Sequence, residues 1–175
     1  MSAVEADHLV ITRPRATIHI YEDRVEKHFL DTKVAAAEHY WYTEVPWACP
    51  QLLDHSATHI VIARGTPAHR HPRYQPIKEL RKLLQRLGKL GIHHRDVWPG
   101  NIIATPQGPK LIDWETATQN TSATTSYDLH GPELSGIPVP DIHRNLGRTP
   151  KSPNGYVMFW GSKHPKSISN LWNGA

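Results

Sequence analysis

The stretch HHRDVWPGNII, residues 93–103, places Asp96 before a Pro-Gly turn and Asn101 directly after it. A second stretch, KLIDWE (110–115), follows it and puts Asp113 at the end of a short apolar run. Carboxylate and amide oxygens are ligands that Mg²⁺ takes in proteins, and a carboxylate can also accept the proton of a hydroxyl group. The order of these three side chains therefore predicts a site for phosphate chemistry rather than a purely structural loop.

Composition narrows the class of protein. The chain has 175 residues, 38% of them hydrophobic and 21% charged, which suits one globular domain or two small lobes. One cysteine, Cys49, excludes an internal disulfide framework, and the N-terminus shows no signal-peptide pattern, so we expect a cytoplasmic protein. The net charge of +4 suits an anionic ligand such as a nucleotide. We do not expect nucleic acid as a partner. No apolar run is long enough to predict a membrane-spanning helix. The paired histidines at 69/71 and 93/94 lack the spacing of a zinc site.

Hydrophobic periodicity and turn residues predict the elements. Asp31 and Thr32 are typical N-cap residues, and six leucine or isoleucine side chains recur at helical spacing after residue 76. The predicted elements are two strands within 16–30, a helix over about 32–45, two strands within 48–65, a helix over 77–90, and a hairpin around TPQGP (105–109). Residues 127–175 are predicted to be mostly irregular, with short helices near 141–146 and 165–171.

The eight residues from His94 to Asn101 match the pattern H-R-D-x-x-x-x-N in every fixed position. They resemble the catalytic loop of the protein kinase-like superfamily, which implies ATP and Mg²⁺ as cofactors, Asp96 as catalytic base and Asn101 as a magnesium ligand. Asp113 begins D-W-E where protein kinases have D-F-G, and it is implied to hold the bridging magnesium. The D-W-E form is similar to that of aminoglycoside phosphotransferases and choline kinases.

Residues in the N-terminal half also resemble motifs of the kinase-like superfamily, but less closely. The tripeptide ending at Lys27 resembles the A-x-K of the family, which implies that this lysine reaches the phosphates. Its partner on the following helix is expected to be Glu38, with Glu44 as the alternative. The backbone of Ala63 and Gly65, after a predicted strand, falls where the family binds adenine.

The resemblance covers roughly residues 10–130 and departs from the family at several points. No G-x-G-x-x-G precedes the lysine, so Arg13 and Arg15 are expected to supply cations in its place. We expect an α+β, two-lobed protein kinase-like fold that is minimal and has a truncated C-terminal lobe. Residues 1–66 would form the N-terminal lobe and 67–175 the C-terminal lobe of one kinase domain, and Asp128 would brace the catalytic loop.

The expected function is transfer of the γ-phosphate of ATP to a hydroxyl group, with a slight preference for a protein Ser/Thr kinase. Arg95 precedes Asp96 as in protein kinases, where this arginine pairs with a phosphorylated segment. Seven Ser or Thr residues between Asp113 and Asp128 would be phosphate acceptors within the chain itself. Trp98, where Ser/Thr kinases usually carry lysine, argues against this preference. A small-molecule kinase and a non-catalytic nucleotide-binding scaffold remain the alternatives.

Overall fold

The computed structural model describes residues 8–71, 73–74, 76–123 and 125–142. The chain divides into two compact units, Met1–Gly65 and Thr66–Ala175, which are described separately below. Most of the helix predicted near 141–146, and all of the one predicted near 165–171, lie outside the described residues. Within the described ranges no helix combines the length and the apolar character needed to cross a membrane.

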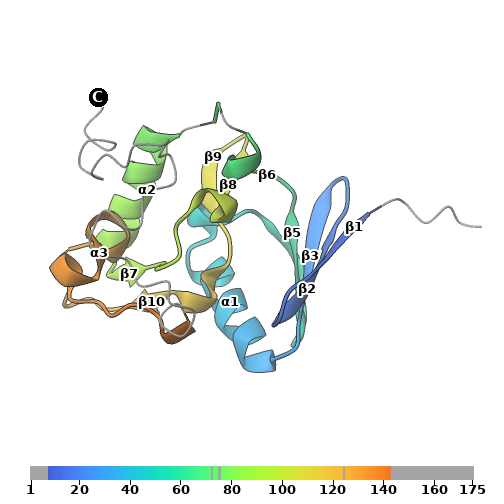
Figure 1. Cartoon of the computed structure of the whole chain (residues 1–175), viewed down its shortest axis with the longest axis horizontal. Helices are drawn as coiled ribbons and strands as arrows, with labels where there is room; N and C mark the ends of the chain where they lie inside the picture. Colours follow the sequence, from blue (N-terminus) through green and yellow to red (C-terminus); the bar gives the residue numbers. More distant parts are fainter. Residues whose placement is uncertain (1–7, 72, 75, 124, 143–175) are drawn as a thin grey trace, which may run out of the picture. The chain divides into compact units, whose positions relative to one another are not determined.

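The first unit is built on a five-stranded antiparallel sheet with the strand order β1-β2-β3-β5-β4 (Figure 1). Both strands predicted within 16–30 are present, as are both predicted within 48–65; the edge strand β1 was not predicted, because its exposed residues show no alternation. The strands are β1 (Leu9–Thr12), β2 (Ala16–Ile20), β3 (Arg24–Phe29), β4 (Leu52–His55) and β5 (His59–Ala63).

Helix α1 (Thr32–Glu44) begins where the sequence predicts. The carboxylate of Asp31 accepts a hydrogen bond from the Lys33 N–H at 2.8 Å, which caps the helix. A short 3-10 turn, η1 (Pro46–Ala48), follows directly. The helix packs against one face of the sheet through its buried residues, which include Ala35, Trp41 and Tyr42.

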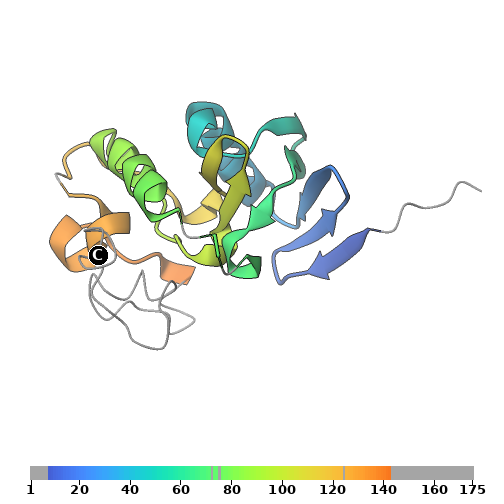
Figure 2. The ribbon, with the colours of Figure 1, turned by 90° about the horizontal axis from the view of Figure 1, so that it is seen from above.

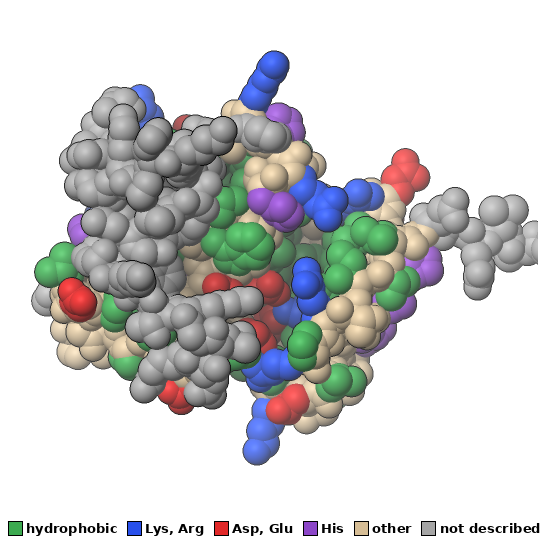
Figure 3. All heavy atoms as spheres, in the orientation of Figure 1, with side chains coloured by type: hydrophobic (Ala, Val, Ile, Leu, Met, Phe, Trp, Pro, Cys, Tyr) green, Lys and Arg blue, Asp and Glu red, His purple; other side chains and the backbone are tan. Residues whose placement is uncertain are grey.

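The other face of this sheet carries a row of aromatic rings. Alternation along β3 puts Lys27 on the side of α1 and His28 on the opposite side. His28 lies 5.2 Å from His19 and 5.4 Å from His59, measured between ring centroids, and histidine side chains are visible at this edge in Figure 3. Within the described ranges no cluster of three histidine, cysteine or acidic side chains is arranged to hold a metal ion.

The second unit joins one long helix to short strands. Helix α2 (Ile77–Lys89) contacts both strand β9 and helix α3 (Figures 1 and 2). The predicted hairpin is present as β8 and β9, and β6 adds a third strand to it. The remaining elements are β6 (Thr66–Pro67), η2 (Ala68–Arg70), β7 (Ile92–His93), η3 (Pro99–Asn101), β8 (Ile102–Thr105), β9 (Gly108–Leu111), η4 (Trp114–Thr116), β10 (Thr118–Gln119) and α3 (Tyr127–Ser135).

The core of the second unit is centred on the apolar stripe of α2. Leu80, Leu84 and Leu87 are completely buried there, while Leu90, just past the helix, is 46% exposed. Ile102, Leu111, Trp114 and Tyr127 are also fully buried in this unit. The hairpin and the turns that carry the candidate site are therefore built directly on the hydrophobic core.

Replacing Leu84 with alanine should remove about 2–5 kcal/mol from the free energy of unfolding, because truncating a fully buried leucine leaves a cavity. The matched control is Leu90→Ala, which deletes the same atoms from an exposed position and should change stability by no more than about 0.5 kcal/mol. Urea denaturation followed by circular dichroism measures both. Equal losses for the two variants would contradict the assignment of the core.

Candidate active site

The loop that contains Asp96 is held by a buried carboxylate from helix α3. Asp128 is 1% exposed, and its two oxygens accept hydrogen bonds from the backbone N–H groups of His94 at 2.7 Å and Arg95 at 2.8 Å. Ser126 caps the same helix by accepting a hydrogen bond from the Leu129 N–H. The bracing of this loop by Asp128 that the sequence suggested is thus present in the structure.

Burial raises the pKa of Asp128 to about 6 from its ordinary 3.8, and the two backbone hydrogen bonds oppose this shift. Because the folded-state pKa is raised, the contribution of this carboxyl to stability decreases as the pH rises from 3.8 to about 6. Above that range the carboxylate is charged and buried, and the two N–H donors stabilise the charge. The geometry shows why the carboxylate is nevertheless required: both backbone donors need an acceptor.

Two neighbouring histidines complete the frame of the loop. The Nδ1 atom of His94 accepts a hydrogen bond from the Asp96 N–H at 3.2 Å, and its Nε2 lies 2.9 Å from the Ile112 carbonyl oxygen, so Nε2 carries the proton. The Nδ1 atom of His93 accepts from the Tyr127 N–H at 3.1 Å, and burial lowers the pKa of His93. The Nδ1 atoms of both rings therefore accept hydrogen bonds from backbone donors.

Arg95 has a left-handed backbone, with φ of 67°, a conformation that costs a non-glycine residue about 1–2 kcal/mol. Its Nε donates to the Thr116 carbonyl oxygen at 2.7 Å and its Nη1 to the Pro138 carbonyl oxygen at 3.0 Å. In this structure the guanidinium donates to two carbonyl groups, and its pairing with a phosphorylated residue stays a prediction. Its position in this structure is that of a brace for the surrounding backbone.

Several residues of the Ser/Thr-rich segment make specific contacts with the backbone of the second unit. The Thr116 side chain is buried, and its hydroxyl donates to the His94 carbonyl oxygen at 3.0 Å. Thr118 lies in strand β10, which pairs with β7, and Asn120 N–H donates to the Gly91 carbonyl oxygen at 2.7 Å. Glycine is required at that point because its φ is 69° and a Cβ there would meet the Asn120 oxygen at 2.6 Å.

Asp96 and Asn101 lie together at the end of the loop. The Asn101 side-chain amide donates from Nδ2 to both the carbonyl oxygen and the carboxylate of Asp96, each at 2.9 Å. Its backbone carbonyl accepts from the Ile112 N–H at 3.0 Å, which ties it to the segment leading to Asp113. These bonds fix the side-chain orientation of a residue that is only 2% exposed.

Asp113 follows strand β9 in a left-handed conformation, with φ of 61°. The next residue, Trp114, is fully buried; its Nε1 donates to the Leu111 carbonyl oxygen at 2.8 Å, and its ring meets the edge of the His94 ring. The tryptophan of D-W-E thus anchors the turn in the core and leaves the partly exposed Asp113 at its start.

The residues fit a magnesium ion that is shared with phosphate groups. Mg²⁺ in nucleotide sites takes one or two protein carboxylates together with phosphate oxygens and water. The amide nitrogen of Asn101 binds Asp96, and its amide oxygen would be the ligand atom. Asp113 would supply the carboxylate.

In the first unit, Lys27 and Glu38 form an ion pair. Lys27 Nζ donates to Glu38 Oε2 at 2.9 Å, with the side chains 15% and 1% exposed. Glu44, the alternative partner, lies exposed near the end of α1. The pairing expected from the sequence is therefore present, and burial of the carboxylate makes it more than a surface contact.

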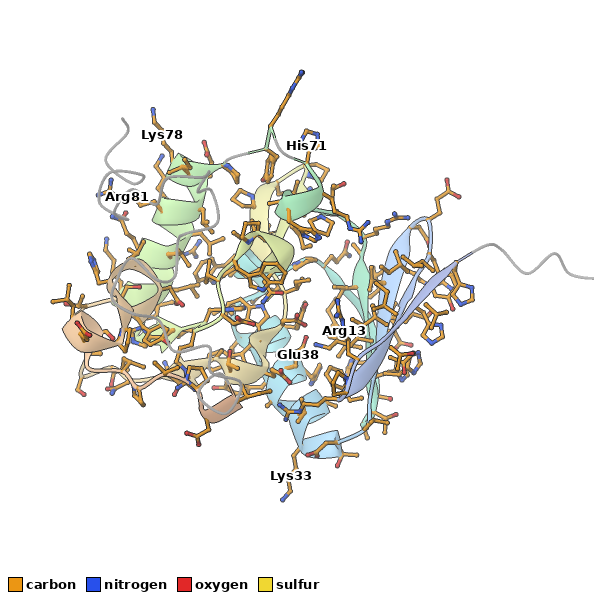
Figure 4. All side chains as sticks on the ribbon, in the orientation of Figure 1. Arg13, Lys33, Glu38, His71, Lys78 and Arg81 are labelled. Carbon is orange, nitrogen blue, oxygen red and sulfur yellow. The ribbon has the colours of Figure 1, made fainter. Side chains whose placement is uncertain are left out.

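The first unit also contains Ala63 and Gly65, which the sequence predicts to bind adenine, and Arg13, which it predicts to bind phosphate. Ala63 N–H donates to the Gln51 carbonyl oxygen at 2.9 Å, so an adenine contact at this residue would have to use its carbonyl group. Gly65 is the last residue of the unit, and its adenine contact stays a prediction. Arg13 lies in the tight turn between β1 and β2, and Figure 4 shows its side chain on the same side of the sheet as Glu38.

Comparison with solved structures finds similarity to WbdD. The 2.2 Å crystal structure of WbdD matches with a TM-score of 0.50 at 22% sequence identity, over 64% of this chain and 33% of the WbdD chain. A co-crystal structure of WbdD and the kinase inhibitor LY294002 matches with a TM-score of 0.47 at 21% identity, over 63% of this chain and 33% of that one. This chain therefore spans about a third of the WbdD chain, and the similarity is one of fold, which in this chain is mixed α+β with antiparallel sheets. No protein-family model matches the sequence, and no curated protein matches it.

Asp128→Asn should destabilise the chain by about 3 kcal/mol, because an amide offers one acceptor oxygen and sets its NH₂ group against the second backbone donor. Asp54→Asn, the same change at a largely exposed carboxyl group, is the control and should leave the free energy of unfolding nearly unchanged. Chemical denaturation at pH 7.5 measures both. A loss no larger than that of the control would show that Asp128 does not hold the loop.

Proposed function

We propose that this protein is an ATP- and magnesium-dependent phosphotransferase that acts on a hydroxyl group. The observation that carries the proposal is the Asp96–Asn101 pair: a carboxylate oriented by an amide, on a loop held by buried Asp128, with Asp113 following on the connected segment. The similarity of fold to WbdD supports it.

In the proposed reaction Asp96 accepts the proton of the acceptor hydroxyl. The acceptor oxygen forms a bond to the γ-phosphorus of ATP, and the bond from that phosphorus to the β,γ-bridging oxygen breaks. ADP departs with the electron pair of the broken bond, so that the products are ADP, the phosphorylated acceptor and a proton. Asp96 also orients the hydroxyl for in-line attack, and its own position is set by Asn101 and His94.

Magnesium, when bound by Asp113 and Asn101, would offset the negative charge of the phosphate oxygens. Lys27 would add a fixed cation for the phosphate tail, because its pairing with Glu38 holds the ammonium group in place. In the absence of a glycine-rich loop, Arg13 and Arg15 are the further cations that we assign to phosphate binding.

The acceptor is proposed as either a protein Ser/Thr side chain or a small molecule. The sequence slightly favoured the protein, with the segment after Asp113 as its own substrate. Within that segment Thr116 is a poor acceptor, because its hydroxyl is buried and donates to the His94 carbonyl oxygen. A small-molecule hydroxyl compound is the alternative acceptor.

Asp96→Asn should lower kcat for phosphate transfer by about 10²–10⁴-fold while ATP still binds, because the amide cannot accept the proton. Asp113→Asn should instead abolish the magnesium dependence of ATP binding. Transfer from γ-labelled ATP is followed against a panel of proteins and small hydroxyl compounds, and ATP binding is followed by calorimetry with and without Mg²⁺. Glu133→Gln, at an exposed position of the second unit, is the control.

Near-normal transfer by the Asp96 variant would reject the proposed mechanism. ATP binding by the wild-type chain without any turnover would instead identify a non-catalytic nucleotide-binding protein. Label on the chain itself, lost in Asp96→Asn, would restore autophosphorylation as the activity.

Glu38→Gln should lower kcat/KM for ATP by roughly tenfold or more, since Lys27 loses a charged hydrogen-bond partner. Glu44→Gln removes the same charge from the exposed end of the same helix and should leave kcat/KM for ATP unchanged. Steady-state kinetics with varied ATP compare the two variants. Indistinguishable values would show that the ion pair has no part in nucleotide binding.

A further inference from the structure

Hydrogen bonds to the loop that contains Asp96 hold the chain directly before Asp113. The N–H of Ile112, the preceding residue, donates to the Asn101 carbonyl oxygen at 3.0 Å. The Ile112 carbonyl oxygen lies 2.9 Å from Nε2 of His94. Both backbone polar groups of the residue before Asp113 are therefore bound to that loop.

Thr116, three residues after Asp113, is bound to the same loop by two further hydrogen bonds. Its carbonyl oxygen accepts from Nε of Arg95 at 2.7 Å, and its hydroxyl donates to the His94 carbonyl oxygen at 3.0 Å. Thr116 is only 6% exposed, so a bond to solvent would not readily replace the hydroxyl bond if the hydroxyl were removed. The segment that carries Asp113 is thus attached to the loop on both sides of this carboxylate.

Asp113 itself has a left-handed backbone between the two attachments, with φ of 61°. Such a conformation is retained only where the surrounding contacts enforce it. Burial of Trp114 supplies one of these contacts, and the hydrogen bonds of Ile112 and Thr116 supply others on either side. A shift of residues 112–116 against the loop would carry the Asp113 carboxylate with it.

We propose that Thr116 is a positioning residue for Asp113, and that its hydroxyl bond to the loop sets how well this carboxylate binds magnesium. The inference rests on the proposed function, in which Asp113 supplies the carboxylate ligand. Mg²⁺ demands near-ideal octahedral geometry at short distances, so a small displacement of a ligand weakens binding. Replacing residues that orient a metal ligand typically lowers metal affinity by about 10–100-fold. Because Trp114 and Ile112 keep their contacts, we expect a smaller effect for Thr116, about three- to tenfold.

The test removes the hydroxyl while keeping the size of the side chain. Thr116→Val does this, and Thr116→Ser retains the hydroxyl and should behave almost as the wild type. Thr43→Val is the matched control, because it deletes a hydroxyl that donates to a backbone carbonyl oxygen, that of His39, at an exposed position of α1. Circular dichroism verifies that each variant is folded.

Calorimetry on the full chain measures the affinity for ATP twice, in excess Mg²⁺ and in EDTA. Mg²⁺ should raise the affinity of the wild-type chain for ATP. In Thr116→Val this gain should be smaller by about three- to tenfold, while the affinity in EDTA stays unchanged. The comparison separates positioning from a general structural effect, because a disturbed fold would lower both affinities.

The possible outcomes separate this inference from the proposed function. An equal gain from Mg²⁺ in Thr116→Val and the wild type would overturn the role of Thr116, even if the chain transfers phosphate. Equal weakening of both affinities, or a wild-type chain that gains nothing from Mg²⁺, would overturn it as well. A gain that depends on Thr116, without phosphate transfer to any acceptor, would reject the phosphotransferase and retain Thr116 as the residue that positions Asp113.

Discussion

The candidate site depends on one buried carboxylate. Asp128 sits in helix α3 and accepts hydrogen bonds from two successive backbone N–H groups at the start of the loop. A buried charge is unfavourable in itself, and the raised pKa of Asp128 records that cost. The buried carboxylate orients the loop, because two short hydrogen bonds to its oxygens fix the direction of the backbone just before Asp96. The groups that would perform chemistry are thus oriented by a residue more than thirty positions away in the chain.

Two strained residues lie on either side of this arrangement. Arg95 and Asp113 are the non-glycine residues with positive φ in the described part of the chain, and both flank groups assigned to the site. Strain of this kind persists only where neighbouring contacts enforce it. At Arg95 those contacts are the two carbonyl groups bound by its guanidinium, and at Asp113 the adjacent contact is the burial of Trp114. Each strained turn is therefore next to a side chain that is anchored elsewhere in the second unit.

The sequence predicted the helices and strands that depend on residues close together in the chain. Alternation located β2 and β3, Asp31 located the start of α1, and the leucine stripe located α2. The Lys27–Glu38 pair followed because helix position separates Glu38 from the exposed Glu44. The two-residue strands β7 and β10 could not be predicted, since so short a pairing leaves no periodicity. The same holds for Thr116 and His94, whose roles depend on hydrogen bonds to backbone groups of other segments. The catalytic assignments stay predictions, because neither the fold nor the hydrogen bonds report turnover.

The fixed position of residues 114–120 has a thermodynamic consequence. These residues form η4 and β10, and the Asn120 N–H donates to the Gly91 carbonyl oxygen. A stretch held this way cannot swing as a hinged flap. To move it must break several hydrogen bonds together, which makes its motion a cooperative local unfolding event. A change that displaces this segment would also weaken the pairing of β10 with β7, which contains His93. The backbone amides of these two strands would then exchange hydrogen faster.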